Sequence, residues 1–432
     1  MYKAYITKIK EVRPHSNADR LQCVSCFGNN VVVGLDTKVG DLGVYFGADG
    51  RLGEEYAELN NLVRKKDDNG NSIGGYLDPD KRKVSTIKLR GEESDGLFMP
   101  IESLSRFCDI SKLKEGDTID VLNGVVICEK YVPRGSSVPK FAKGKTSKSK
   151  KSEIDKYPIF FEHKHTSQLC YNHHVFSEGD LCYITLKMHG TSQRTSLTVK
   201  ERVDKRPKWL KRIFKKPNEK SWENMCGTRR VVLKGFDKEG FYGNNDFRKQ
   251  HHDKFVGKLQ KGESVFYEVV GYMGEDKPIM SDCANSKLKD KDFVKKYGDT
   301  TRFSYGCEQG ESEMYVYRMT MTNEDGFVVE YPWEQVKRRC EQMAVNCVPE
   351  FDKFFFTTIE DLMDRVERYC DGIDPIGKNH IREGVVVRID SKDGFSAYKH
   401  KNFSFKILEN IIKVEAMAPD IEEEQDLFEE NS

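Results

Sequence analysis

Residues 186–196 read LKMHGTSQRTS, and this stretch decides how the larger part of the chain is interpreted. Lys187 stands at the end of the apolar run LCYITLKM, which has the pattern of a buried β-strand, and His189, Gly190 and two hydroxyl residues follow it. A lysine at such a position is either a solvated strand end or a nucleophile. An ε-amine attacks phosphorus only when it is unprotonated, and burial near other cations favours that neutral form. Gly190 leaves room for a phosphate or a sugar against the backbone.

The composition of the chain is that of a soluble protein with two domains. Its 432 residues exceed what one hydrophobic core usually organises. Lys and Arg number 71 and Asp and Glu 70, so the net charge is close to zero although charges segregate locally. The cysteines lie scattered in apolar runs, which is typical of a reducing compartment. We therefore expect a cytoplasmic or nuclear protein. The sequence contains no apolar run long enough to predict a membrane span.

Changes in composition divide the chain into four parts. Residues 1–130 consist of short β-like runs, and residues 131–156 lose apolar periodicity and collect lysines, as expected of a basic flexible linker. Residues 157–415 form the larger domain, in which residues 205–216 interleave basic and aromatic side chains. That stretch suits phosphates with a stacked base, or it is a solvated insertion. Residues 416–432 contain an acidic tail.

The strand-like runs of residues 1–130 include AYITKIKEV, LQCVSCF, LGVYFG and GLFMPI, separated by Gly, Asn and Asp clusters. This spacing predicts an all-β, OB-like barrel, closed or partly closed. The stretch Val12–Gln22, VRPHSNADRLQ, resembles OB-fold modules that bind tRNA in synthetase-associated proteins. The alternative is a Pro-Asn-Asp turn that links two strands. We interpret this part as an OB-like nucleic-acid-binding domain.

Strand and helix patterns are mixed in residues 157–415. The runs SVFYEVVGYM, EMYVYRMTM, GVVVRID and FSFKIL have strand patterns, whereas residues 333–345 and 358–370 have helical periodicity. This mixture predicts an α+β domain built on antiparallel sheets.

Three residues within the strand-like runs of this domain are candidates for contacts with a ligand. Glu268 lies inside SVFYEVVGY, where a carboxylate is normally excluded, although an edge strand would tolerate it. Tyr315 and Tyr317 in EMYVYRM offer aromatic faces for a purine, and core packing is the alternative.

A second carboxylate and two lysines follow near the end of the domain. Glu383 precedes the apolar run GVVVRID, where it could bind a divalent cation directly or through water. Lys399 and Lys401 in AYKHKNFSFK are spaced i, i+2, so a strand would project both amines from one face. Two adjacent cations suit a triphosphate.

The order lysine, glutamate, aromatic, glutamate and paired lysines resembles the covalent nucleotidyltransferase superfamily of polynucleotide ligases and mRNA capping enzymes. Over residues 160–410 the chain is similar to an ATP-dependent RNA ligase. The resemblance implies an α+β nucleotidyltransferase fold with ATP-grasp-like antiparallel sheets and helices. It implies catalytic roles for Lys187, Lys399 and Lys401, and a metal site, Mg²⁺ or Mn²⁺, at Glu383 and Glu268. The nucleotide-binding set that it implies is Lys187, His189, Gly190, Arg229, Glu268, Tyr317, Glu383, Lys399 and Lys401.

An OB-like domain ahead of the catalytic domain is similar to the RNA ligases of the Deinococcus and Naegleria type. The resemblance implies sealing of 3′-OH and 5′-phosphate ends through a lysyl-AMP intermediate and an adenylylated 5′ end. We expect a monomer whose partner is RNA or an RNA-containing duplex. A phosphate-dominated grip on that partner would be strongly salt-dependent.

The chain also departs from the pattern of that superfamily. Many members have Asp where this chain has His189, and Arg318 replaces the Asp that often follows the stacking aromatic. Ser192 stands where DNA ligases and capping enzymes usually carry an arginine, which favours an RNA ligase. A capping guanylyltransferase, a DNA ligase and a non-enzymatic RNA-binding protein are the alternatives.

Overall fold

The computed structural model describes residues 2–66, 72–131, 153–204, 219–233, 235–236, 246–274 and 277–415. The chain divides into two compact units, Met1–Arg134 and Gly135–Ser432. Most of the expected linker, the basic stretch 205–216 and the acidic tail 416–432 lie outside the described residues.

The first unit consists mainly of short antiparallel strands. A four-stranded sheet has the order β11-β5-β1-β12, and a three-stranded sheet has the order β2-β3-β4. Among the described residues the strands form several separate ladders, so no single ladder closes into a barrel, and a short helix, α1 (Glu54–Leu59), adds to the strands. The strands of these two sheets are β1 (Ala4–Lys8), β2 (Val12–Pro14), β3 (Leu21–Cys26), β4 (Asn29–Gly34), β5 (Leu42–Phe46), β11 (Leu97–Pro100) and β12 (Thr118–Ile119).

The remaining strands of the first unit pair in twos. They are β6 (Gly50–Leu52) with β15 (Cys128–Lys130), β7 (Arg64–Lys66) with β8 (Ser72–Gly74), β9 (Thr86–Leu89) with β10 (Glu92–Asp95), and β13 (Val121–Leu122) with β14 (Val125–Val126). The stretch Val12–Gln22 contains β2, the turn that follows it and the first two residues of β3, and Pro14 lies opposite Gln22. His15 is buried in this turn, 3.0 Å through Nε2 from the carbonyl oxygen of Leu89.

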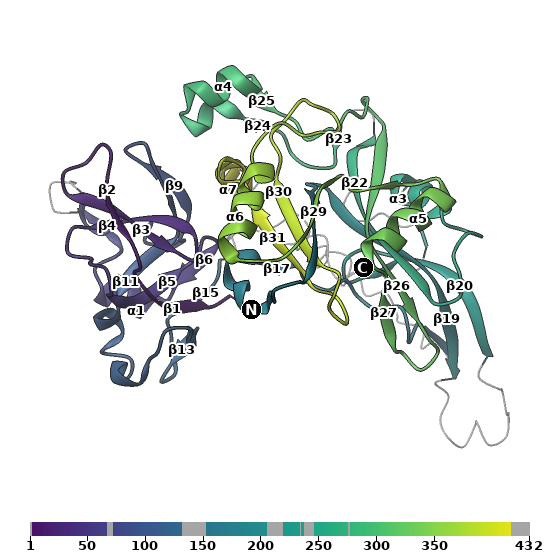
Figure 1. Ribbon diagram of the computed structural model, residues 1–432, viewed down its shortest axis with the longest axis horizontal. Helices are drawn as coiled ribbons and strands as arrows, with labels where there is room; N and C mark the ends of the chain where they lie inside the picture. Colours follow the sequence, from purple (N-terminus) through teal and green to yellow (C-terminus); the bar gives the residue numbers. More distant parts are fainter. Residues whose placement is uncertain are drawn as a thin grey trace, which may run out of the picture. The chain divides into compact units, whose positions relative to one another are not determined.

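The second unit contains a nine-stranded sheet. Its main path is β21-β20-β19-β22-β26-β27, antiparallel throughout, with three short strands paired at its sides (Figure 1). Its strands are β16 (Glu153–Lys156), β19 (Thr191–Asp204), β20 (Glu219–Gly227), β21 (Val232–Leu233), β22 (Glu263–Gly274), β23 (Lys277–Pro278), β26 (Ser312–Thr322), β27 (Val328–Glu330) and β28 (Asn346–Cys347).

A five-stranded sheet of order β17-β31-β30-β18-β29 completes the framework of the second unit. All its pairs are antiparallel except β17 with β31. Its strands are β17 (Ser167–Gln168), β18 (Leu181–Lys187), β29 (Glu350–Phe355), β30 (Gly384–Ile389) and β31 (Ala397–Lys401), and a further short pair joins β24 (Cys283–Ala284) to β25 (Thr300–Thr301).

The helices of this unit among the described residues are α3 (Asp246–Asp253), α4 (Lys291–Tyr297), α5 (Trp333–Met343), α6 (Ile359–Cys370) and α7 (Phe403–Glu415). The helices α3 and α5 contact the nine-stranded sheet, and α6 contacts the five-stranded sheet. The hydroxyl of Thr358 accepts a hydrogen bond from the backbone N–H of Asp361 and caps α6. The buried side chains Leu362 and Val366 of α6 pack with Val385 and Val387 of β30. Burial of this kind stabilises the fold by about 1.5–3 kcal/mol for each large aliphatic side chain.

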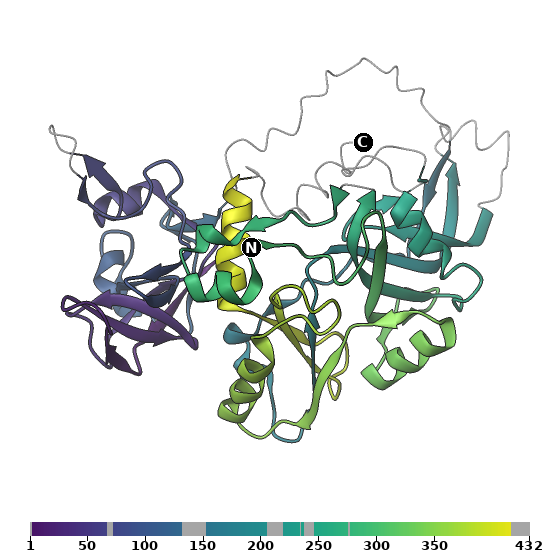
Figure 2. The same cartoon turned by 90° about the horizontal axis from the view of Figure 1, so that it is seen from above.

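The helix α7 corrects one prediction from the sequence. The run FSFKIL has the alternation of a strand, yet it forms the first turns of α7. The side chain of Asn402 accepts a hydrogen bond from the backbone N–H of Phe405, so an N-cap starts the helix directly after β31. Phe405 and Leu408 are then buried at helical spacing. The helix, yellow in Figure 2, lies beside β24 and the short 3-10 helix Asn285–Leu288.

The predicted fold class is otherwise confirmed, with an α+β unit on mostly antiparallel sheets after a unit of short strands. All twelve cysteines are free thiols. No helix in the described ranges is long and apolar enough to cross a membrane.

Candidate active site

The stretch KMHG connects the two large sheets. Lys187 is the last residue of β18 in the five-stranded sheet, and Thr191 is the first residue of β19 in the nine-stranded sheet. Gly190 passes close to β22, since a Cβ atom at this position would lie 2.4 Å from the carbonyl oxygen of Val269. Only glycine therefore fits at this crossing without a shift of backbone.

The register of the five-stranded sheet aligns the lysines. Lys187 lies opposite Gly384, and Gly384 lies opposite Lys401. Directly opposed residues project to the same side of an antiparallel sheet, so Lys187 and Lys401 share one face. Lys399, opposite Val386, projects from that face as well, two residues earlier in β31.

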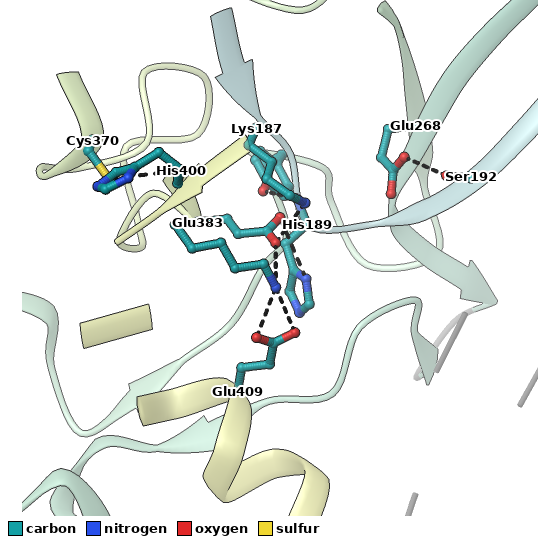
Figure 3. Close-up of polar contacts among 10 residues, drawn as sticks. Lys187, His189, Ser192, Glu268, Cys370, Glu383, His400 and Glu409 are labelled. Carbon is teal, nitrogen blue, oxygen red and sulfur yellow. Dashed lines mark hydrogen bonds and ion pairs between the residues drawn. The ribbon is translucent and has the colours of Figure 1, made fainter. Parts of the chain in front are cut away.

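Glu383, the residue just before β30, contacts both Lys187 and Lys401. Its Oε1 lies 2.7 Å from Nζ of Lys187 (Figure 3) and 3.2 Å from Nζ of Lys401. The carboxylate is only 2% exposed, and its Oε2 has no hydrogen-bond partner among the described residues. Burial by itself would raise the pKa of Glu383, but the charges of Lys187 and Lys401 lower it below its usual value. The group is therefore a buried carboxylate that remains ionised.

His189 is packed beneath this cluster. Its Nδ1 lies 3.9 Å from Oε2 of Glu383, and its ring meets the rings of Phe303 and Phe405 edge to face. Burial lowers the pKa of His189 to about 4, against the opposing effect of Glu383. The ring is therefore neutral at pH 7. The backbone N–H of His189 donates a 2.6 Å hydrogen bond to the hydroxyl of Tyr305.

A further carboxylate, which the sequence did not reveal, reaches the cluster from α7. Both oxygens of Glu409 lie 2.9 Å from Nζ of Lys401. In Figure 3, Glu409 points from its helix towards Glu383 and His189. Lys401 therefore contacts two carboxylates in this structure.

Glu268 occupies the neighbouring part of the nine-stranded sheet. It is 8% exposed, and its Oε2 accepts a 3.1 Å hydrogen bond from the hydroxyl of Ser192 on the adjacent strand. Tyr315 lies directly opposite Glu268 in β26. Ser192 stands where DNA ligases and capping enzymes usually carry an arginine, and its hydroxyl thus donates a hydrogen bond to Glu268.

Tyr317 is the extra residue of a β-bulge in β26. Val316 pairs with Tyr267 and Arg318 pairs with Phe266, which leaves Tyr317 between them without a counterpart in β22. Its half-buried ring meets the ring of His163 edge to face, with ring centres 5.5 Å apart.

Arg229 lies close to the same segment. The backbone N–H of His163 donates a 3.1 Å hydrogen bond to the carbonyl oxygen of Arg229, and the Arg229 guanidinium contacts His165. Arg194, which is 1% exposed, donates a 2.7 Å hydrogen bond to the same carbonyl oxygen. The structure thus joins Tyr317 and Arg229 through His163.

The sequence-derived residues therefore form two groups. Lys187, His189, Glu383 and Lys401 make direct contacts at the end of the five-stranded sheet, and Glu268, Tyr317 and Arg229 belong to the nine-stranded sheet and its loops. The sequence analysis missed Glu409, Tyr305, His163 and Arg194. Arg194 alone had a local signal, a charged residue in the alternating strand that follows Gly190.

The donors around Glu383 fit a hard divalent cation that keeps water or substrate oxygens as its other ligands. The buried Oε2 without a hydrogen-bond partner is a suitable first ligand, and neutral His189 does not repel a cation. No group of three or more His, Cys, Asp or Glu side chains that could hold a metal occurs in the described part of the chain. Mg²⁺ commonly binds in this way, through one or two carboxylates and phosphate oxygens.

Comparison with protein families identifies the class to which this fold and site belong. An RNA ligase family model matches residues 180–408, more than half of the chain, and an OB-fold domain model matches residues 3–101. The chain belongs to the RNA ligase family. No curated protein matches it.

Solved structures of Naegleria gruberi RNA ligase have a similar fold. A variant with ATP and Mn is 16% identical over 94% of this chain and 98% of that chain, with a TM-score of 0.58. Another variant, with AMP and Mn, is 17% identical over the same shares, with a TM-score of 0.57. A structure with PPi is 17% identical over 93% of this chain and 97% of that chain, with a TM-score of 0.56.

Proposed function

We propose that this chain is an ATP-dependent RNA ligase that joins 3′-OH and 5′-phosphate ends through an AMP carried on Lys187. The observation that carries the proposal is the shared carboxylate, since Glu383 contacts Lys187 and Lys401 on one sheet face. This arrangement fixes a nucleophilic amine beside a phosphate-binding ammonium group. Membership of the RNA ligase family and the fold shared with ligases solved with ATP and AMP support it.

In the first step, the deprotonated amine of Lys187 attacks the α-phosphorus of ATP. A P–N bond forms, the bond from the α-phosphorus to the oxygen that bridges to the β-phosphate breaks, and pyrophosphate leaves with that electron pair. The nitrogen of Lys187 gives up one proton to water as the phosphoramidate forms. Lys401 and Lys399 stabilise negative charge on the phosphates from the same sheet face. Glu383 orients both amines before the nucleotide arrives.

The nucleoside part of ATP would lie on the nine-stranded sheet. Tyr317 offers a half-buried aromatic face to adenine. Arg229 lies close to Tyr317, because His163 contacts both residues, and from there it would contact the ribose or a phosphate. Tyr315 is the alternative stacking residue, because it lies opposite Glu268. Gly190 allows the nucleotide to approach the backbone.

The expected cofactor is Mg²⁺ or Mn²⁺, held by Glu383 and, directly or through water, by Glu268. Neutralisation of charge on the triphosphate is the chemistry that such an ion supplies. His189, where many relatives have Asp, packs edge to face against Phe303 and Phe405, so we assign it a packing role beside Glu383.

In the later steps AMP passes to the 5′-phosphate of the RNA, and the 3′-OH of the neighbouring strand then displaces it. The N-terminal OB-fold unit would hold the RNA or RNA-containing duplex, mainly through phosphates. We expect a monomer in which the first unit, residues 1–130, serves the catalytic unit, residues 157–415. Binding should weaken steeply between low and moderate salt.

The first test is covalent labelling of the protein with α-labelled ATP or GTP in the presence of Mg²⁺ or Mn²⁺. Acid-labile label from ATP is expected on wild type and not on Lys187→Ala. Lys392→Ala is the matched control, because Lys392 pairs with Asp180 and takes no part in the site. Label from GTP alone would indicate a capping guanylyltransferase, and no label from folded protein freed of bound AMP would reject the enzyme.

The second test separates RNA from DNA sealing. Nicked duplexes with either RNA or DNA at the 3′-OH end are compared with the same 5′-phosphate strand. Sealing of the RNA-ended nick at a rate at least about tenfold higher is expected, and a preference for the DNA end would indicate a DNA ligase.

A further inference from the structure

Carboxylate oxygens surround the ammonium group of Lys401. It carries three N–H donors, and three carboxylate oxygens surround it, one from Glu383 at 3.2 Å and two from Glu409 at 2.9 Å. A phosphate oxygen that binds Lys401 would therefore compete with these two carboxylates for the ammonium group.

Glu383 is the carboxylate that stays. It is 2% exposed, its other cation is Lys187 at 2.7 Å, and its backbone oxygen accepts a 2.9 Å hydrogen bond from the N–H of Asn402. Both its side chain and its backbone are therefore tied to the two lysine-bearing strands. Because Glu383 is also the counterion of Lys187, moving it away from Lys401 would disturb the ion pairs of both lysines.

Glu409 is held less firmly. Its side chain is 13% exposed and lies on α7, beyond the N-cap that Asn402 provides. Rotation about its side-chain torsions can withdraw the carboxylate without breaking a backbone hydrogen bond. The same helix is anchored to the site by Phe405, whose ring contacts His189, so the helix itself can stay in place.

We propose that Glu409 occupies the phosphate site of Lys401 in the nucleotide-free protein, and that a polyphosphate must displace it to bind. This inference rests on the proposed function, in which Lys401 contacts phosphate. Glu409 thus weakens the binding of ATP and of pyrophosphate. The weaker hold on pyrophosphate favours its departure after Lys187 has taken the AMP.

The test measures binding of inorganic pyrophosphate to the full chain by calorimetry, independently of any catalysis. Glu409→Gln removes the charge and keeps the size of the side chain. Affinity for pyrophosphate is expected to rise about threefold to tenfold. In a Lys401→Met background, Glu409→Gln is expected to change the affinity for pyrophosphate by less than about twofold. The ammonium group for which Glu409 and pyrophosphate compete is then absent.

The matched control is Glu367→Gln. Glu367 lies 3.0 Å from His400, the residue before Lys401, but its side chain is 63% exposed and comes from α6. Pyrophosphate affinity of this variant should equal that of wild type. A similar rise in both variants would overturn the proposal, since it would reflect net charge alone.

Kinetics of Lys187 adenylylation provide the second readout. Glu409→Gln should lower the half-saturating ATP concentration about threefold to tenfold and leave the rate at saturating ATP unchanged. A large fall in that saturating rate, or unchanged pyrophosphate affinity, would overturn the proposal and make Glu409 a residue that positions Lys401. If wild type forms no adenylate while pyrophosphate affinity still responds to Glu409→Gln, the ligase function fails and the competition stands.

Discussion

Lys187 and Lys401 contact the same atom, Oε1 of Glu383, at 2.7 Å and 3.2 Å. One buried carboxylate therefore holds the proposed nucleophile and a proposed phosphate ligand in a fixed relation. The two lysines come from strands separated by β30, and they meet because Gly384 lies between them in register without a side chain of its own.

Replacing this carboxylate should affect both stability and catalysis. Glu383→Gln leaves two ammonium groups near a buried amide, so the free energy of unfolding should fall by about 2–4 kcal/mol, as measured by urea denaturation. The rate of adenylylation should fall by about 100-fold or more, because the amines of Lys187 and Lys401 are no longer held in place by a carboxylate between them.

Glu334→Gln is the matched control for Glu383→Gln. Glu334 also contacts two lysines, Lys337 and Lys353, but its side chain is 44% exposed. Its loss should change stability by less than about 1 kcal/mol. Equal effects of the two substitutions would contradict a special role for Glu383.

The hydroxyl of Tyr305 should support the nucleophile motif. Tyr305→Phe keeps the ring but leaves the backbone N–H of His189 without its 2.6 Å partner. We expect a loss of about 1–3 kcal/mol in the free energy of unfolding and about tenfold slower adenylylation, measured by urea denaturation and labelling. Tyr183→Phe, which removes a hydrogen bond to Glu334, should leave adenylylation unchanged. Normal labelling of Tyr305→Phe would show that the motif keeps its position without this hydrogen bond.

Gly190 should not tolerate a side chain. A Cβ atom would lie 2.4 Å from the carbonyl oxygen of Val269, so Gly190→Ala must move the crossing between the sheets. A loss of about 1–3 kcal/mol and of most adenylylation is expected. Gly274→Ala in the same strand as Val269 is the control, because a Cβ atom there meets nothing within 4 Å. A stable and active Gly190→Ala protein would refute the close approach.

Acid should destabilise the protein in part through His251. Burial, reinforced by nearby Lys254, lowers the pKa of this histidine to about 4, whereas its value in an unfolded chain is 6.5. Between these values the unfolded chain binds a proton that the folded protein does not. Stability is therefore full above about pH 6.5 and falls towards pH 4, by up to about 1.4 kcal/mol per pH unit for this residue.

Urea denaturation of wild type and His251→Gln at pH 7 and pH 5 measures this contribution. The variant should show the smaller loss between the two pH values. Identical losses would mean that His251 becomes protonated in the folded protein as readily as in the unfolded one.

The sequence predicted the elements of the catalytic unit better than their contacts. Two local patterns were sufficient to predict an apolar strand and a lysine-bearing strand. They are the apolar run GVVVRID and the i, i+2 spacing of Lys399 and Lys401. The helices at 333–345 and 358–370 are confirmed as α5 and α6 for the same reason. The prediction of a strand at FSFKIL was wrong, because it rested on the alternation of apolar residues and ignored Asn402. The side chain of Asn402 caps a helix that begins there.

Contacts that depend on strand register, or on a helix that the sequence did not predict, could not be foreseen. Glu409 lies eight residues beyond Lys401 on α7, where the alternation of FSFKIL had indicated a strand. The bulge at Tyr317 is a property of how two strands align, and neither strand encodes it alone. Tyr305 lies far along the chain from His189, so no spacing rule connects them.

The short connection between β18 and β19 has a consequence for the entropy of catalysis. Lys187 is paired to Gly384 at one end of this connection, and Thr191 is paired to Val269 at the other. The backbone of the nucleophile is thus immobilised by two separate ladders before any substrate is present. The loss of freedom needed to aim the amine at phosphorus occurs once, during folding, and need not be repeated in each turnover.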